Sequence, residues 1–75
     1  MKLKKINAGE YRTVKPVYGK TFYGYVRRNE NDFGTNPIWA YGLCEKDFTI
    51  IEAIMTTDTK AEAVTDLEDY LNDYI

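Results

Sequence analysis

Seventy-five residues limit this chain to one small domain, which we expect to span residues 1–75. The chain has no His, Ser or Gln and a single Cys, which excludes Ser-His-Asp and Cys-His catalysis and zinc sites built on imidazole. The net charge of −2 and the hydrophobic content of 44% indicate a globular protein rather than a disordered one. We therefore expect a non-enzymatic domain without a cofactor or a metal ion.

The first half of the chain predicts strands separated by turn-forming residues. The basic start, Met1–Asn7, is either a short edge segment or a loose arm. Glu10–Val17 has the composition of a strand, but Pro16 cannot donate a hydrogen bond to a neighbouring strand and therefore predicts an edge position. Thr21–Arg28 has the clearest strand pattern.

A loop and two further strands are predicted next. Asn29–Pro37 is rich in turn formers, and its Phe33 either anchors a partner or covers one end of the sheet. Strands are expected at Ile38–Glu45 and Phe48–Met55, joined by a tight turn. Such short connections favour antiparallel pairing of neighbouring strands.

The C-terminal segment predicts a helix over Lys60–Tyr74, because its apolar residues recur at helical spacing. Thr59 and Glu62 match the capping box that begins many helices, and Asp58 is the alternative cap. The predicted fold is α+β, a four-stranded antiparallel meander with one C-terminal helix packed on one sheet face.

A row of carboxylates along this helix is the first candidate binding surface. We call it the acidic ridge, and it consists of Glu62, Asp66, Asp69 and Asp73. None of the four has a Lys or Arg three or four residues away, so mutual repulsion slightly destabilises the helix. The carboxylate row is spaced much like nucleic-acid phosphates and could occupy a Lys/Arg groove of a nucleic-acid-binding protein. The alternative is a solvated face that only keeps the protein soluble.

The second candidate surface is the sheet face opposite the helix. Small side chains in Ile38–Glu45 would let the helix approach the other face closely. Four aromatic residues would then line the open face, where they could bury a protein partner or stack nucleobases. The alternatives are that this face is the true core, or that its tyrosines only reflect strand propensity. The four are Tyr23, Tyr25, Trp39 and Tyr41.

Charge is distributed unevenly along the chain. Residues 1–28 hold eight of the ten basic residues and one acid, whereas residues 56–75 hold six acids and one base. This asymmetry indicates charged partners, unless the two halves neutralise each other in the fold. It supports an alternative function, a nucleic-acid-binding module that uses the basic half together with the Tyr/Trp face. The basic residues concerned are Lys2, Lys4, Lys5, Arg12, Arg27 and Arg28.

The chain opens on MKLKKINAGEYRT and closes on TKAEAVTDLEDYL. In size and charge it resembles small proteins encoded by bacteriophages and mobile elements, among them anti-CRISPR proteins and other inhibitors of host defence. The order of sheet and helix also resembles the arm-type DNA-binding modules of phage integrases, although an acidic helix does not suit that role. The first resemblance implies a non-enzymatic protein in the bacterial cytoplasm that binds a basic nucleic-acid channel on its target.

The leading hypothesis is therefore a non-catalytic protein-binding module, with an inhibitory role as one form of it. A nucleic-acid-binding module is the first alternative, and a small homo-oligomer subunit, such as a homodimer, is the second. No membrane partner is expected, because no apolar run in the sequence is long enough to span a bilayer. The lone Cys44 cannot close an intramolecular disulfide, which favours a reducing, cytoplasmic location.

Overall fold

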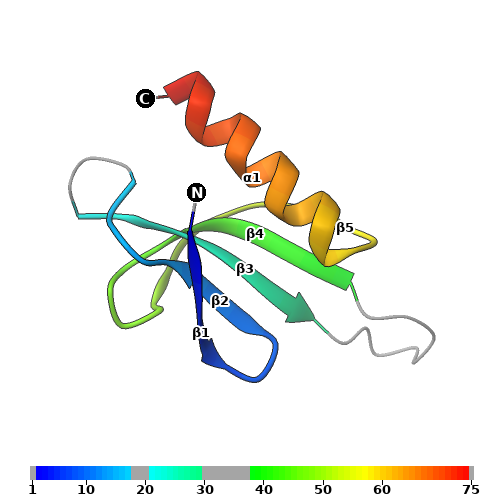
Figure 1. The fold of residues 1–75 in the computed structure, drawn as a ribbon, viewed down its shortest axis with the longest axis horizontal. Helices are drawn as coiled ribbons and strands as arrows, with labels where there is room; N and C mark the ends of the chain where they lie inside the picture. The colour runs from blue at the N-terminus through cyan, green and yellow to red at the C-terminus, as the bar shows by residue number, and fades with distance from the viewer. Residues whose placement is uncertain (1, 18–20, 30–37, 75) are drawn as a thin grey trace.

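The computed structural model describes residues 2–17, 21–29 and 38–74, and at 73 and 74 it describes the backbone alone. Five strands form one antiparallel meander in the order β1-β2-β3-β4-β5, and one helix follows them (Figure 1). The α+β class, the antiparallel sheet and the single C-terminal helix are confirmed, but the predicted number of four strands is wrong. The elements are β1 (Leu3–Asn7), β2 (Glu10–Thr13), β3 (Tyr23–Asn29), β4 (Ile38–Cys44), β5 (Ile50–Thr57) and α1 (Lys60–Tyr74).

The additional strand is β1, for which the sequence left a loose arm as one alternative. Gly9 has a φ of 71°, a left-handed conformation that glycine adopts without steric cost. It turns the chain back so that Leu3 pairs with Thr13 and Lys5 pairs with Tyr11. As a result β2 lies inside the sheet rather than at its edge. Pro16 is compatible with this position because β2 ends at Thr13.

The last strand lies two residues further along the chain than predicted. Phe48 has a φ of 71° and belongs to the turn before β5, so it cannot begin the strand. Within this turn the Phe48 N–H donates to the Glu45 carbonyl over 3.0 Å, and the Glu45 N–H donates to the Thr49 carbonyl over 2.9 Å.

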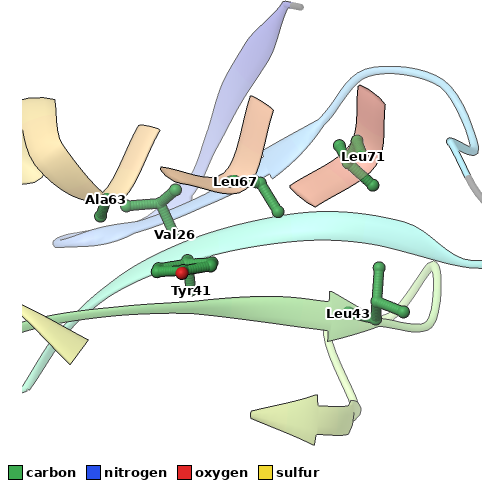
Figure 2. Close-up of a cluster of buried hydrophobic side chains, with 6 residues drawn as sticks. All are labelled: Val26, Tyr41, Leu43, Ala63, Leu67 and Leu71. Atoms are coloured by element: carbon green, nitrogen blue, oxygen red, sulfur yellow. The ribbon is translucent and has the colours of Figure 1, made fainter. Parts of the chain in front are cut away.

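The helix packs on one face of the sheet, as predicted (Figure 1). Ala63, Leu67 and Leu71 project from α1 toward the sheet, where they meet side chains of β3 and β4 (Figure 2). The buried residues of this main core are Val26, Tyr41, Leu43, Ala63, Leu67 and Leu71. The three that lie on α1 have the helical spacing of apolar residues that predicted this helix.

The prediction of which side chains lie on the helix side of the sheet is correct for β3 and wrong for β4. Directly paired residues of antiparallel strands point to the same face, and the pairs are Val26 with Tyr41 and Tyr25 with Gly42. Tyr41, together with Val26, therefore lies under the helix, and Trp39 packs against the same core. Ala40, Gly42 and Cys44 lie on the opposite face with Tyr23 and Tyr25, so the four aromatic residues are divided between the two faces.

In the part of the chain that the structure describes, no helix is long and apolar enough to cross a membrane. The predicted loop with Phe33 falls on residues 30–37, which lie outside the described residues.

Candidate interaction surface

Tyr23 and Tyr25 are the two predicted aromatic residues on the face away from the helix, and both side chains are buried. They form a second, smaller core with Cys44, against which Phe48 and Ile50 pack. A stacking platform requires exposed rings. These two tyrosines therefore do not form one.

Arg12 covers the Tyr23 ring, with its guanidinium carbon 4.3 Å from the ring centroid. The side chain is itself buried, and it donates hydrogen bonds to the backbone carbonyls of Thr13 and Lys46. The charge of Arg12 is thus committed to the fold, and the residue is not a free contact for a phosphate.

Phe48 packs against Tyr25, with the two rings edge to face and their centroids 5.7 Å apart. Tyr25 can lie flat over β4 because Gly42 has no side chain. A Cβ atom at position 42 would lie 2.9 Å from the Tyr25 ring and 2.1 Å from the Glu52 carbonyl oxygen. Burial raises the pKa of the neighbouring Cys44 thiol to about 11, so this thiol is not ionised near neutral pH.

Trp39 and Tyr41, the other two predicted aromatic residues, lie on the helix side. Trp39 is half-buried, and its ring centroid lies 6.4 Å from that of Tyr11 on β2. The Lys60 ammonium in turn lies 3.7 Å from the centroid of the Tyr11 ring. These contacts connect the first residue of the helix to side chains of β2 and β4, which gives the aromatic residues a structural role.

The acidic ridge keeps the helical arrangement that its spacing predicts. Glu62 and Asp69 are exposed and Asp66 is half-buried, while the side chain of Asp73 is outside what the structure describes. Glu62 also belongs to the cap, because its backbone N–H donates a hydrogen bond to the Thr59 hydroxyl oxygen over 3.2 Å. Asp66 and Asp69 therefore form the part of the ridge that the helix cap does not use.

The effect of Asp66 and Asp69 on Tyr41 shows on which side of the helix this part of the ridge lies. The pKa of its hydroxyl is raised, first by burial and then by the negative charges of Asp66 and Asp69. The ridge thus stands on the flank of α1 nearer to β4. On the opposite flank, Glu68 lines a groove of about 590 Å³ together with Lys2 and Lys15.

Within the residues that the structure describes, no ion pair joins the basic half of the chain to the acidic half. Among the described residues the one ion pair joins Glu10 to Arg27, over 3.9 Å, and both belong to the basic half. Lys4 and Lys5 are exposed on β1, at the sheet edge opposite β5. The molecule therefore has a basic edge at β1 and an acidic ridge on the other side.

Sequence reasoning missed the exposed apolar residues of β5. Ile51 is 44% exposed and Met55 is 61% exposed. The signal for them was present, since Phe48–Met55 carries one charged residue, Glu52. Met55 is the cross-strand partner of Tyr41, on which Asp66 and Asp69 act, so this exposed apolar side chain and the acidic ridge lie on the same side of the sheet.

Comparison of the chain with protein-family models, with curated proteins and with solved structures found no match.

Proposed function

We propose that this chain is a non-catalytic protein-binding module that docks its acidic ridge on a basic surface of a partner protein. The observation that carries the proposal is the uncompensated charge of Asp66 and Asp69. No Lys or Arg forms an ion pair with either carboxylate in the described part of the chain. Their mutual repulsion disfavours the folded state slightly, so folding alone does not account for them.

The apolar neighbour of the ridge favours a protein as the partner. Protein interfaces combine apolar anchors with a polar rim. Met55 supplies an exposed, adaptable apolar side chain on the same side of the sheet as Asp66 and Asp69. A purely electrostatic surface would not need it.

The class of partner that we propose is a nucleic-acid-binding protein. Such a protein presents a Lys/Arg groove that normally holds phosphates, and a row of carboxylates is complementary to that groove. Occupying the groove would exclude the nucleic acid, so the module would act as an inhibitor. The resemblance to small phage-encoded inhibitors of host defence implies the same kind of partner.

Direct nucleic-acid binding has less support from the described residues. Arg12 is buried against Tyr23, and the predicted Tyr/Trp face does not form because Tyr41 lies under the helix. What is left for this alternative is a set of exposed basic side chains that could contact phosphates without reading bases. A labelled DNA or RNA that shifts with the protein at low salt would support it.

The decisive experiment is a pull-down from bacterial lysate with the wild-type chain and with the double variant Asp66→Lys/Asp69→Lys, read by mass spectrometry. We expect a nucleic-acid-binding protein to be retained by the wild type, released by salt and lost from the double variant. Salt sensitivity is expected because exposed charges are screened.

A matched control changes the same number of charges elsewhere. Glu45→Lys/Glu68→Lys alters one turn residue and one residue on the other flank of the same helix. It should retain the partner at the wild-type level. Equal retention by the Asp66→Lys/Asp69→Lys variant would refute the proposed function.

A further inference from the structure

The two edges of the sheet differ in how they are protected against pairing with another chain. Edge strands are commonly shielded by lysines and by short length. β1 has five residues and exposes Lys4 and Lys5. β5 has eight residues and carries one charge, at Glu52. Within the described residues β4 is the one strand that pairs with β5, so the outer edge of β5 is open.

Irregularities in β5 determine which part of this edge an added strand would meet. The pairing of β4 with β5 shifts between Tyr41 and Gly42 and again between Leu43 and Cys44. The stretch Met55–Thr57 lies outside both shifts and pairs regularly with Trp39–Tyr41. Bulges bend a strand, so the regular stretch at Met55–Thr57 is the best template for a further strand.

The negative charge on this side of the sheet indicates which kind of chain would pair with β5. Met55 pairs with Tyr41, whose hydroxyl lies in the field of Asp66 and Asp69. A strand added outside β5 would lie about 5 Å from β5. Its side chains on the helix side of the sheet would share that side with the acidic ridge. A second copy joined β5 to β5 would bring two ridges face to face across the twofold axis, and their repulsion opposes that dimer.

We propose that the outer edge of β5 accepts an extended, Lys/Arg-bearing segment of a partner protein as a sixth strand. Backbone hydrogen bonds to the stretch Met55–Thr57 supply affinity, as in other cases of strand addition. Because side chains alternate along a strand, basic residues at every second position face the acidic ridge. This inference rests on the proposed function for the charge of the partner, and it adds the mode of binding.

The test uses a short fluorescent peptide of alternating lysine and valine, and the same peptide with alternate backbone nitrogens methylated. Methylation keeps the charge and removes the backbone donors. We expect saturable binding of the first peptide, with shifts of the amide resonances of Met55, Thr56 and Thr57. The methylated peptide should bind roughly tenfold more weakly or worse, since each lost hydrogen bond costs about 1 kcal/mol.

Two protein variants test whether the peptide binds at the edge of β5. Met55→Lys places a charge on β5, and Val14→Lys makes the same kind of change at another exposed apolar residue. The first should abolish peptide binding and the second should leave it unchanged. Equal binding of both peptides, or no saturable binding of either, would overturn the edge proposal. So would a dimer of the free chain that Met55→Lys dissociates, because it would make a second copy the occupant.

The two proposals fail in different ways. If the lysate partner depends on Asp66 and Asp69 but not on Met55, the edge proposal is wrong and docking through the acidic ridge stands. If the partner is retained without Asp66 and Asp69, the proposed function itself is wrong.

Discussion

Thr59 is the N-cap of the helix, which begins at Lys60. The Glu62 N–H donates to the Thr59 hydroxyl oxygen over 3.2 Å, and the hydroxyl in turn donates to the Glu62 carboxylate over 3.2 Å. The Thr hydroxyl thus satisfies a backbone donor that the first turn of a helix leaves without a partner. Among the described residues, Asp58, the alternative cap in the sequence, forms no such hydrogen bond to the first turn.

We predict that Thr59→Ala lowers the free energy of unfolding by about 0.5–2 kcal/mol, because the first turn loses its cap. The midpoint of denaturant unfolding measures the effect. Thr65→Ala is the matched control, since Thr65 is exposed within α1 and alanine favours the helix there. A midpoint unchanged by Thr59→Ala would transfer the capping role to Asp58.

Phe48 has a left-handed backbone that bulky residues rarely adopt. The conformation is retained because the ring packs against Tyr25. Both Phe48→Ala and Phe48→Gly lose this packing, but glycine tolerates the backbone and alanine does not.

We therefore predict that Phe48→Gly is more stable than Phe48→Ala by about 1 kcal/mol, the reverse of the usual order in a regular element. Both should be less stable than the wild type. Thermal unfolding of the three proteins gives the order, and Phe48→Ala at or above the stability of Phe48→Gly would contradict the role assigned to the backbone.

At the scale of elements, Leu67 joins α1 to the sheet, with its side chain fully buried in the main core (Figure 2). We predict that Leu67→Ala lowers the free energy of unfolding by about 2–4 kcal/mol, because truncation leaves a cavity between helix and sheet. Ile51→Ala is the control, since Ile51 is 44% exposed and its truncation leaves no cavity. Equal denaturant midpoints for Leu67→Ala and wild type would show that α1 does not depend on this contact.

The helix could be predicted from the sequence with its bounds, Lys60–Tyr74, because its signals are local. A cap, an apolar period and the acidic ridge are all defined by residues a few positions apart. The same local period correctly placed Glu62, Asp66 and Asp69 on one flank of α1.

The sheet could be predicted less completely because its arrangement depends on pairing. The basic composition of β1 concealed a strand that the turn at Gly9 makes possible. The face of Tyr41 depends on its register with Val26, and a shift of one residue exchanges the faces. Alternation within β4 defined two sets of side chains, but it did not indicate which set lies under the helix.

At the scale of the whole molecule, the sheet has a core on each face. The main core lies under α1, and the second core lies under Arg12 and the turn that contains Phe48. Most of the aromatic side chains that the structure describes belong to these two cores or pack against them, which is expected for a domain that buries only about 60% of its surface. The charged periphery, with the β1 edge and the acidic ridge, is therefore the surface on which the proposed function rests.

The last prediction asks whether the acidic ridge supports the fold. In Asp66→Lys/Asp69→Lys the melting temperature should hold or rise slightly, because repulsion along α1 is relieved. The pKa of Tyr41 should fall toward its ordinary value, since two negative charges that raise it are removed. Alkaline titration of tyrosine absorbance, with Tyr41→Phe to assign the signal, measures the second effect.

The Glu45→Lys/Glu68→Lys variant should leave the pKa of Tyr41 unchanged, because neither residue contributes to its shift. A marked loss of melting temperature in Asp66→Lys/Asp69→Lys would mean that the carboxylates stabilise the packing of α1 on β4. Loss of partner binding could then be a consequence of unfolding. Intact stability together with a lowered Tyr41 pKa would instead show a folded molecule whose ridge has changed sign, so that any loss of binding reports on docking itself.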